Sequence, residues 1–131
     1  MVKIMLVDDN IEIASLFGEI LTDAGFEVDT FTDSLTALNS CVSVRYSLVI
    51  ADVGMPGIDG MSLIQMIRAQ RPGMPYIFLS GRNAPNSGEV IQNADAFILK
   101  TAAPRELVGK LVEVLALKGG DAGTSQALTA L

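Results

Sequence analysis

The sequence contains no histidine and no tryptophan, and a single cysteine among its 131 residues. The missing histidine excludes histidine-based catalysis and histidine-ligated metal sites. Cys41 has no partner for an internal disulfide and forms no CxxC metal or redox motif. Because its apolar neighbours Ala37, Leu38 and Val42 share its face of a predicted helix, we expect Cys41 to be a small core residue.

Basic residues are also few: 9 lysines and arginines against 15 aspartates and glutamates give a net charge of -6 and a pI near 4.4. This balance argues against nucleic-acid binding by the domain on its own, because phosphate contacts need a basic face. No apolar run approaches the roughly 20 residues of a membrane span. The N-terminus turns acidic at Asp8, too early for a signal peptide. We therefore expect a cytoplasmic protein with no membrane contact and one substantial core.

Short apolar runs alternate with stretches of helical periodicity, which predicts an α/β fold. The predicted strands are 3–7, 26–31, 48–51, 76–79 and 94–99. The predicted helices begin after Asn10, after Asp33 or Ser34, at Met61, near Arg82 and at Pro104. The helix over 82–93 is the weakest of these, because Pro85 and Gly88 interrupt it. The pattern predicts five βα units joined by right-handed crossovers, which is a doubly wound parallel sheet.

The predicted helices carry apolar stripes that we expect to face the core rather than a partner. On the second helix this stripe comprises Ala37, Leu38, Cys41 and Val42. From Lys118 onward, glycines and small polar residues replace the apolar periodicity. We therefore expect one domain over residues 1–117 and a tail or linker over 118–131.

Polar residues stand where four of the predicted strands end: Asp8 and Asp9, Asp52, Ser80 and Lys100. Singly, each has an ordinary role as a helix cap, a loop residue or a solvated charge. In a parallel sheet, however, the carboxyl ends of the strands share one edge, so these groups can converge. Three carboxylates close together repel each other unless a cation is present, and Mg²⁺ suits oxygen ligands supplied partly by water. The amine and the hydroxyl could contact the oxygens of a phosphoryl group.

Four segments, at residues 4–10, 52–60, 79–81 and 97–100, carry a resemblance to a known family. They read Ile-Met-Leu-Val-Asp-Asp-Asn, Asp-Val-Gly-Met-Pro-Gly-Ile-Asp-Gly, Leu-Ser-Gly and Phe-Ile-Leu-Lys. Over residues 1 to about 117 the chain resembles a response-regulator receiver domain. The resemblance implies a flavodoxin-like sheet of strand order 2-1-3-4-5. It also implies a signalling switch rather than an enzyme, one that catalyses only its own phosphorylation and dephosphorylation.

The resemblance implies that Asp52 accepts a phosphoryl group from a histidine kinase or phosphotransfer protein and forms an acyl phosphate. It implies a Mg²⁺ ion bound by the side chains of Asp9 and Asp52 and by the backbone carbonyl of Gly54. Asp8 would act on this ion mainly through water. A divalent ion there would offset charge on the phosphoryl oxygens while the protein positions the donor.

The same resemblance assigns roles after phosphorylation. Lys100 would pair with the acylated site, Ser80 would turn toward a phosphoryl oxygen, and Phe97 would follow inward as the switch aromatic. The change would reach a downstream protein or effector domain through the face built from the fourth helix, fifth strand and last helix. A phosphorylation-dependent homodimer is another form that this output could take.

The sequence departs from the family where Thr101 follows Lys100, because the family usually has a proline there with a cis bond. A cis bond before a residue other than proline costs roughly 3 kcal/mol, so we expect a trans bond. Gly54 and Arg82 occupy positions that in this family influence the lifetime of the acyl phosphate.

Two other classes stay open at this point. An aspartyl-phosphate hydrolase of the haloacid dehalogenase type would have a similar sheet and Mg²⁺ site, but its Asp-x-Asp motif is replaced here by Asp-Asp-Asn at residues 8–10. The chain also has no evident cap domain to form a substrate pocket. A pseudo-receiver would keep the fold as a protein-binding module without being phosphorylated.

Overall fold

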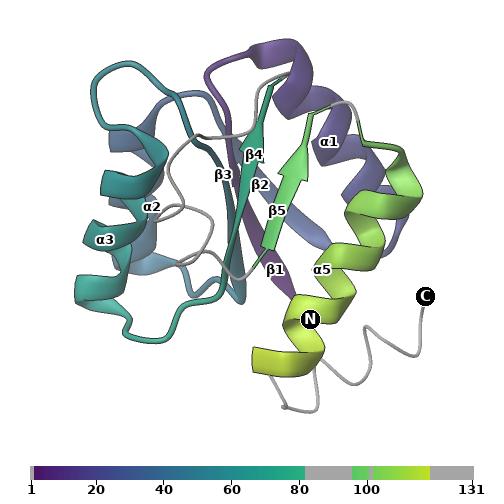
Figure 1. Cartoon of the computed structure of the whole chain (residues 1–131). Coiled ribbons are helices and arrows are strands. Elements are labelled where there is room, and N and C mark those ends of the chain that lie inside the picture. The colour runs from purple at the N-terminus through teal and green to yellow at the C-terminus, as the bar shows by residue number, and fades with distance from the viewer. Residues whose placement is uncertain (1, 82–95, 101, 119–131) are drawn as a thin grey trace.

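The computed structural model describes residues 2–81, 96–100 and 102–118, which contain five parallel strands in the order β2-β1-β3-β4-β5 (Figure 1). The strands are β1 (Lys3–Val7), β2 (Glu27–Phe31), β3 (Leu48–Asp52), β4 (Tyr76–Ser80) and β5 (Ala96–Leu99). The predicted parallel sheet and its strand order are confirmed.

The described helices are α1 (Ile11–Asp23), α2 (Ser34–Ser43), α3 (Gly60–Gln70) and α5 (Pro104–Lys118). In Figure 1, α2 and α3 cover one face of the sheet, and α1 and α5 cover the other. The helix predicted over 82–93, the bond to Thr101 and the tail beyond 118 lie outside the described residues. Among the described helices, none has the length and apolarity needed to cross a bilayer.

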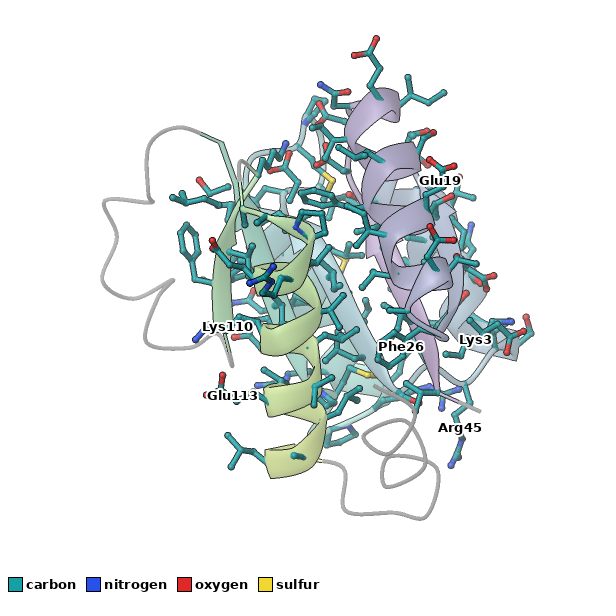
Figure 2. All side chains as sticks on the ribbon, turned by 90° about the vertical axis from the view of Figure 1, so that its right-hand side faces the viewer. Lys3, Glu19, Phe26, Arg45, Lys110 and Glu113 are labelled. Carbon is teal, nitrogen blue, oxygen red and sulfur yellow. The ribbon has the colours of Figure 1, made fainter. Side chains whose placement is uncertain are left out.

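The three central strands, β1, β3 and β4, are apolar on both faces because helices cover both. Along β1, Ile4 and Leu6 belong to the core shared with α1 and α5, whereas Met5 and Val7 belong to the core shared with α2 and α3. Figure 2 shows Phe26 below the lower end of α1, on the side facing α5, where it joins the first of these cores. The edge strand β2 has no fully buried residue, as its alternating sequence predicts.

Capping side chains start the helices that leave the carboxyl edge of the sheet. The Asn10 side chain accepts hydrogen bonds from the backbone N–H groups of Glu12 and Ile13 at 3.0 and 3.2 Å. Asp33 caps α2 by accepting from the Thr36 N–H at 2.9 Å. Both predicted caps are confirmed, and Asp33 rather than Ser34 fills the second position.

Three residues of the apolar helix stripes predicted to face the core are exposed: Leu16, Val42 and Met66. Val42 is 73% exposed, whereas Cys41 beside it is buried, as predicted. The buried stripe of α2 is Ser34, Ala37 and Cys41, and each further residue turns by about 100° around the axis, which carries Val42 out to solvent. Leu16 on α1 is likewise half exposed, because the inner face of that helix is narrower than its apolar run suggests.

A hydrogen-bonded group at buried Tyr46 ties α2 to the edge strand. Its hydroxyl donates to Asp29 Oδ2 at 2.7 Å and lies 2.7 Å from Ser40 Oγ, which therefore acts as donor to it. Burial and the charge of Asp29 raise the pKa of Tyr46 to about 12, against the opposing effect of the Ser40 hydrogen bond. The Arg71 guanidinium joins α3 to the end of α2, donating to the Cys41 carbonyl at 3.2 Å.

Candidate functional site

Three aspartates meet at the carboxyl edge of the sheet, beyond β1 and β3. Asp52 is the last residue of β3, and Asp8 and Asp9 directly follow the neighbouring strand β1. One carboxylate oxygen from each of the three lies within 4.8 Å of the others. Asp8 is completely buried, Asp52 is nearly so, and Asp9 is exposed. The structure therefore brings together the carboxylates that the strand ends predict.

Lys100 reaches this group from β5, two strands away from β3 in the sheet. Its backbone N–H donates to the Ser80 carbonyl at 2.6 Å, and its side chain extends past the end of β4. The Nζ atom lies 2.9 Å from Asp8 Oδ2 and 3.4 Å from Asp52 Oδ1. Burial would lower the pKa of Lys100, but the hydrogen bond to Asp8 and the charges of both aspartates outweigh it and leave the pKa raised.

The pKa of the Asp52 carboxyl is raised above its ordinary value. Burial is the main cause, the negative charge of Asp8 adds to it, and Lys100 acts in the opposite direction. One ammonium group therefore does not compensate fully for burial and the charge of Asp8 together. A further cation at this edge would lower the pKa of Asp52 and favour the ionised form.

The environment of Asp8 provides a direct test of whether a cation fits. Its Oδ1 accepts hydrogen bonds from the Asn10 N–H at 2.9 Å and from Lys100 at 3.2 Å. Its Oδ2 is buried and, although Lys100 Nζ is near, has no hydrogen bond of acceptable geometry within the described part of the chain. A buried carboxylate oxygen without a donor is unfavourable. Carboxylates are the ligands that Mg²⁺ prefers, so this group of residues fits a hard divalent ion.

The other predicted site residues lie around this edge. Ser80 is the last residue of β4 and is buried, and its carbonyl accepts the hydrogen bond from the Lys100 backbone N–H. Phe97 lies in β5 beside Phe78 of β4, is half buried, and borders a hollow between β5 and α5. Gly54 is exposed in the loop after Asp52. Its carbonyl as a metal ligand stays a prediction, and Arg82 lies outside the described residues.

Two residues near the site make contacts that the sequence analysis did not predict. A Cβ atom on Gly60 would lie 2.3 Å from the backbone oxygen of Asp52, so this glycine allows α3 to start directly against β3. Ser34 donates from α2 to the carbonyl of Ile58 in the loop after Asp52, at 2.8 Å. In the sequence, Gly60 is only one of several glycines after Asp52, and Ser34 is only a serine next to the capping residue Asp33. Neither pattern specifies a contact.

The sequence profile described as "Response regulator receiver domain" matches residues 4–112. The chain belongs to this family. Among solved structures it is similar to the chemotaxis protein CheY4 of Vibrio cholerae, with a TM-score of 0.82, 30% identity and coverage of 88% of this chain and 99% of that one. It is also similar to the response regulator TrrA of Thermotoga maritima in complex with Mg²⁺ and BeF, with a TM-score of 0.80, 33% identity and coverage of 88% and 100%.

The receiver domain is also similar to full-length regulators. SilR of Salmonella typhimurium, a probable transcriptional regulatory protein, is 31% identical over 115 residues, which are 86% of this chain and 50% of SilR. PrrA of Mycobacterium tuberculosis, a transcriptional regulatory protein, is 29% identical over 125 residues, 94% of this chain and 54% of PrrA. The chain thus spans about half the length of the curated relatives it matches. The predicted family is confirmed, and the hydrolase alternative finds no support.

Proposed function

We propose that this receiver domain takes a phosphoryl group onto Asp52 from a histidine kinase or phosphotransfer protein, in a reaction that depends on Mg²⁺. The observation that carries the proposal is the cluster of Asp8, Asp9 and Asp52 with Lys100 Nζ 3.4 Å from the acceptor carboxylate. This arrangement places a nucleophilic oxygen next to positive charge at the carboxyl edge of the sheet.

In the proposed step, an ionised oxygen of Asp52 attacks the phosphorus of a phosphohistidine. The new oxygen–phosphorus bond forms as the phosphorus–nitrogen bond breaks. The bonding pair stays on the imidazole, which leaves neutral because its other nitrogen carries the proton. The product is an acyl phosphate on Asp52. The protein's part is to hold the carboxylate ionised and to position the incoming oxygens.

Asp9 and Asp52 would hold Mg²⁺ by their side chains, Gly54 would hold it by its carbonyl, and Asp8 would act mainly through water. When bound, the ion supplies positive charge that offsets the charge on the phosphoryl oxygens. The buried Oδ2 of Asp8, which accepts no hydrogen bond of acceptable geometry in the described part of the chain, and the raised pKa of Asp52 support a cation at this place.

We expect Lys100 to move its contact toward the acylated Asp52, because the new group carries more negative charge than the carboxylate it replaces. Ser80 would donate its hydroxyl to a phosphoryl oxygen, and Phe97 would turn inward. This converts a charge change into a change of the surface that includes β5 and α5. The domain is thus a switch that catalyses only its own phosphorylation and dephosphorylation.

The output partner is a downstream protein or an effector domain. Relatives about twice as long as this chain are transcriptional regulators, which supports an effector domain outside the receiver domain. The acidic balance of the chain supports protein contacts rather than direct nucleic-acid binding by the domain itself. A homodimer formed on phosphorylation is a further form of output.

Labelling with acetyl phosphate tests the proposal. The wild-type protein should gain a phosphoryl group in the presence of Mg²⁺, and the gain should vanish with a chelator and in Asp52→Asn. Asp59→Asn is the matched control, because Asp59 caps α3 from the surface and asparagine caps equally well. Equal labelling of Asp52→Asn and wild type would refute Asp52 as the phosphoryl acceptor. Absence of labelling in wild type would favour a pseudo-receiver that is not phosphorylated.

A further inference from the structure

Ser34 is a buried polar residue whose hydroxyl is not used for helix capping. It is the first residue of α2, is 5% exposed, and follows the actual cap, Asp33. Its Oγ lies 2.8 Å from the carbonyl oxygen of Ile58 and 3.7 Å from Met55 Sδ. The carbonyl is the stronger acceptor and is close, so the single hydroxyl proton is donated to Ile58.

Both partners of Ser34 belong to the loop over residues 53–59, which connects Asp52 to α3. The two ends of this loop are joined by a hydrogen bond from the Gly60 N–H to the Val53 carbonyl at 3.1 Å. Between the ends, Gly54 and Gly57 are exposed, and Gly57 has a φ of +77°. Glycines give this stretch wide conformational freedom, so its shape depends on the points where it is anchored.

Two anchors hold the exposed part of the loop against α2. Met55 buries its side chain in the core shared by α2 and α3, and Ser34 holds the Ile58 carbonyl on the far side. Gly54 lies between Asp52 and the first of these anchors. Loss of the serine hydroxyl would leave a part-buried carbonyl without its donor and would release the limb of the loop that follows Gly54.

We propose that Ser34 is a positioning residue for the metal site, acting through this loop. By fixing Ile58, it restricts the loop to the shape in which the Gly54 carbonyl can bind Mg²⁺ together with Asp9 and Asp52. The inference rests on the proposed function, because it assumes that Gly54 is a ligand. Mutation of a residue that hydrogen-bonds to a metal ligand typically weakens metal binding by about 10- to 100-fold. We expect the low end of this range for Ser34, because it acts through a loop.

The test compares Ser34→Ala with Ser40→Ala. Both variants remove a hydrogen-bonded serine hydroxyl from α2, but Ser40 bonds Tyr46 at the other end of the helix, away from the site. Mg²⁺ affinity is measured by titration, following the chemical shifts of backbone amides. Ser34→Ala should weaken Mg²⁺ binding about 10-fold, and Ser40→Ala should leave it unchanged. The rate of labelling by acetyl phosphate should fall in Ser34→Ala at limiting Mg²⁺ and recover at saturating Mg²⁺.

Hydrogen exchange gives a second readout, since amides of the loop should exchange faster in Ser34→Ala alone. If that variant does not fold, Ser34→Cys replaces it, because cysteine is close in size and a weaker donor, and affinity should then fall by a smaller factor. Unchanged Mg²⁺ affinity in a folded Ser34 variant overturns the inference, as does an equal loss in Ser40→Ala. Either result leaves the proposed function intact if wild type is labelled, whereas absence of Mg²⁺ binding by wild type overturns both.

Discussion

Gly60→Ala places a methyl group where the structure has no room for one. The added Cβ would lie 2.3 Å from the oxygen of Asp52, 3.0 Å from its carbonyl carbon and 3.1 Å from the Cα of Val53. All three are backbone atoms, so no side chain can rotate away. The clash can be relieved only if the start of α3 and the end of β3 move apart by about 1 Å, the gap between this contact and ordinary van der Waals distance.

The size of the effect follows from what resists that movement. Leu63, Ile64 and Ile67 bury the inner face of α3 in the core, and that packing has to be loosened. Overpacking of this kind costs roughly 1–3 kcal/mol. The better helix propensity of alanine returns at most about 1 kcal/mol, and less at the first helical position. We therefore expect Gly60→Ala to lower the free energy of unfolding by about 2 kcal/mol.

Urea unfolding followed by far-UV circular dichroism measures this loss. Gly109→Ala is the matched control, because Gly109 lies inside α5 and its Cβ would meet nothing within 4 Å. The control should gain stability, by up to about 1 kcal/mol, from helix propensity alone. If Gly60→Ala unfolds at the same urea concentration as wild type, with an unchanged dependence of the unfolding free energy on urea, the start of α3 can move without loss of packing. That result would refute the steric reasoning.

Three further predictions concern polar groups. Because the pKa of Tyr46 is raised from an ordinary value near 10 to about 12, its neutral form contributes stability below pH 10 that is lost as the pH rises toward 12, up to about 3 kcal/mol. Tyr46→Phe should flatten this fall, and absorbance near 295 nm should show a late-titrating phenol that the variant lacks; a late titration unchanged by the substitution would contradict this. Arg71→Ala should cost about 1–2 kcal/mol in urea unfolding by removing its bonds to the end of α2, and exposed Arg45→Ala should cost almost nothing. Lys100→Ala should cost about 3 kcal/mol without Mg²⁺, because it leaves Asp8 and Asp52 unpaired. Added Mg²⁺ should restore much of that loss, and a loss insensitive to Mg²⁺ would argue against a cation site.

The sheet was predictable because its central strands leave few alternatives. Runs such as 48–51 and 76–79 are continuously apolar and short, which suits strands buried on both faces and excludes amphipathic surface helices. The 26–31 run alternates with acidic residues and lies at the edge, as expected. The prediction that Val42 is buried was wrong because an apolar residue one position beyond a buried stripe can face either the core or the solvent. Only the packing of α2 on the sheet determines which face is buried.

The meeting of the aspartates with Lys100 was predictable for a different reason. Parallel pairing forces every strand end to one edge, whatever the side chains do. The choice of partner was not predictable, because Lys100 contacts Asp8 more closely than Asp52 by reaching past β4, and that depends on side-chain length and strand order together. Ser34 was ambiguous because either of two adjacent residues can cap a helix, and the one that does not is released for another contact.

The charge of the site explains why it can act as a switch. If all three carboxylates are ionised, the ammonium of Lys100 leaves a formal charge of −2. Burial raises the pKa of Asp52 and the charge of Asp8 adds to that rise, so a further cation would favour the ionised carboxyl. A divalent cation is the smallest addition that neutralises this formal charge. Acylation of Asp52 then replaces a single negative charge with one of about −1.5 to −2. The site then again carries excess negative charge, even with the cation bound. Lys100 already contacts two aspartates, so we expect its ammonium group to move toward the new charge.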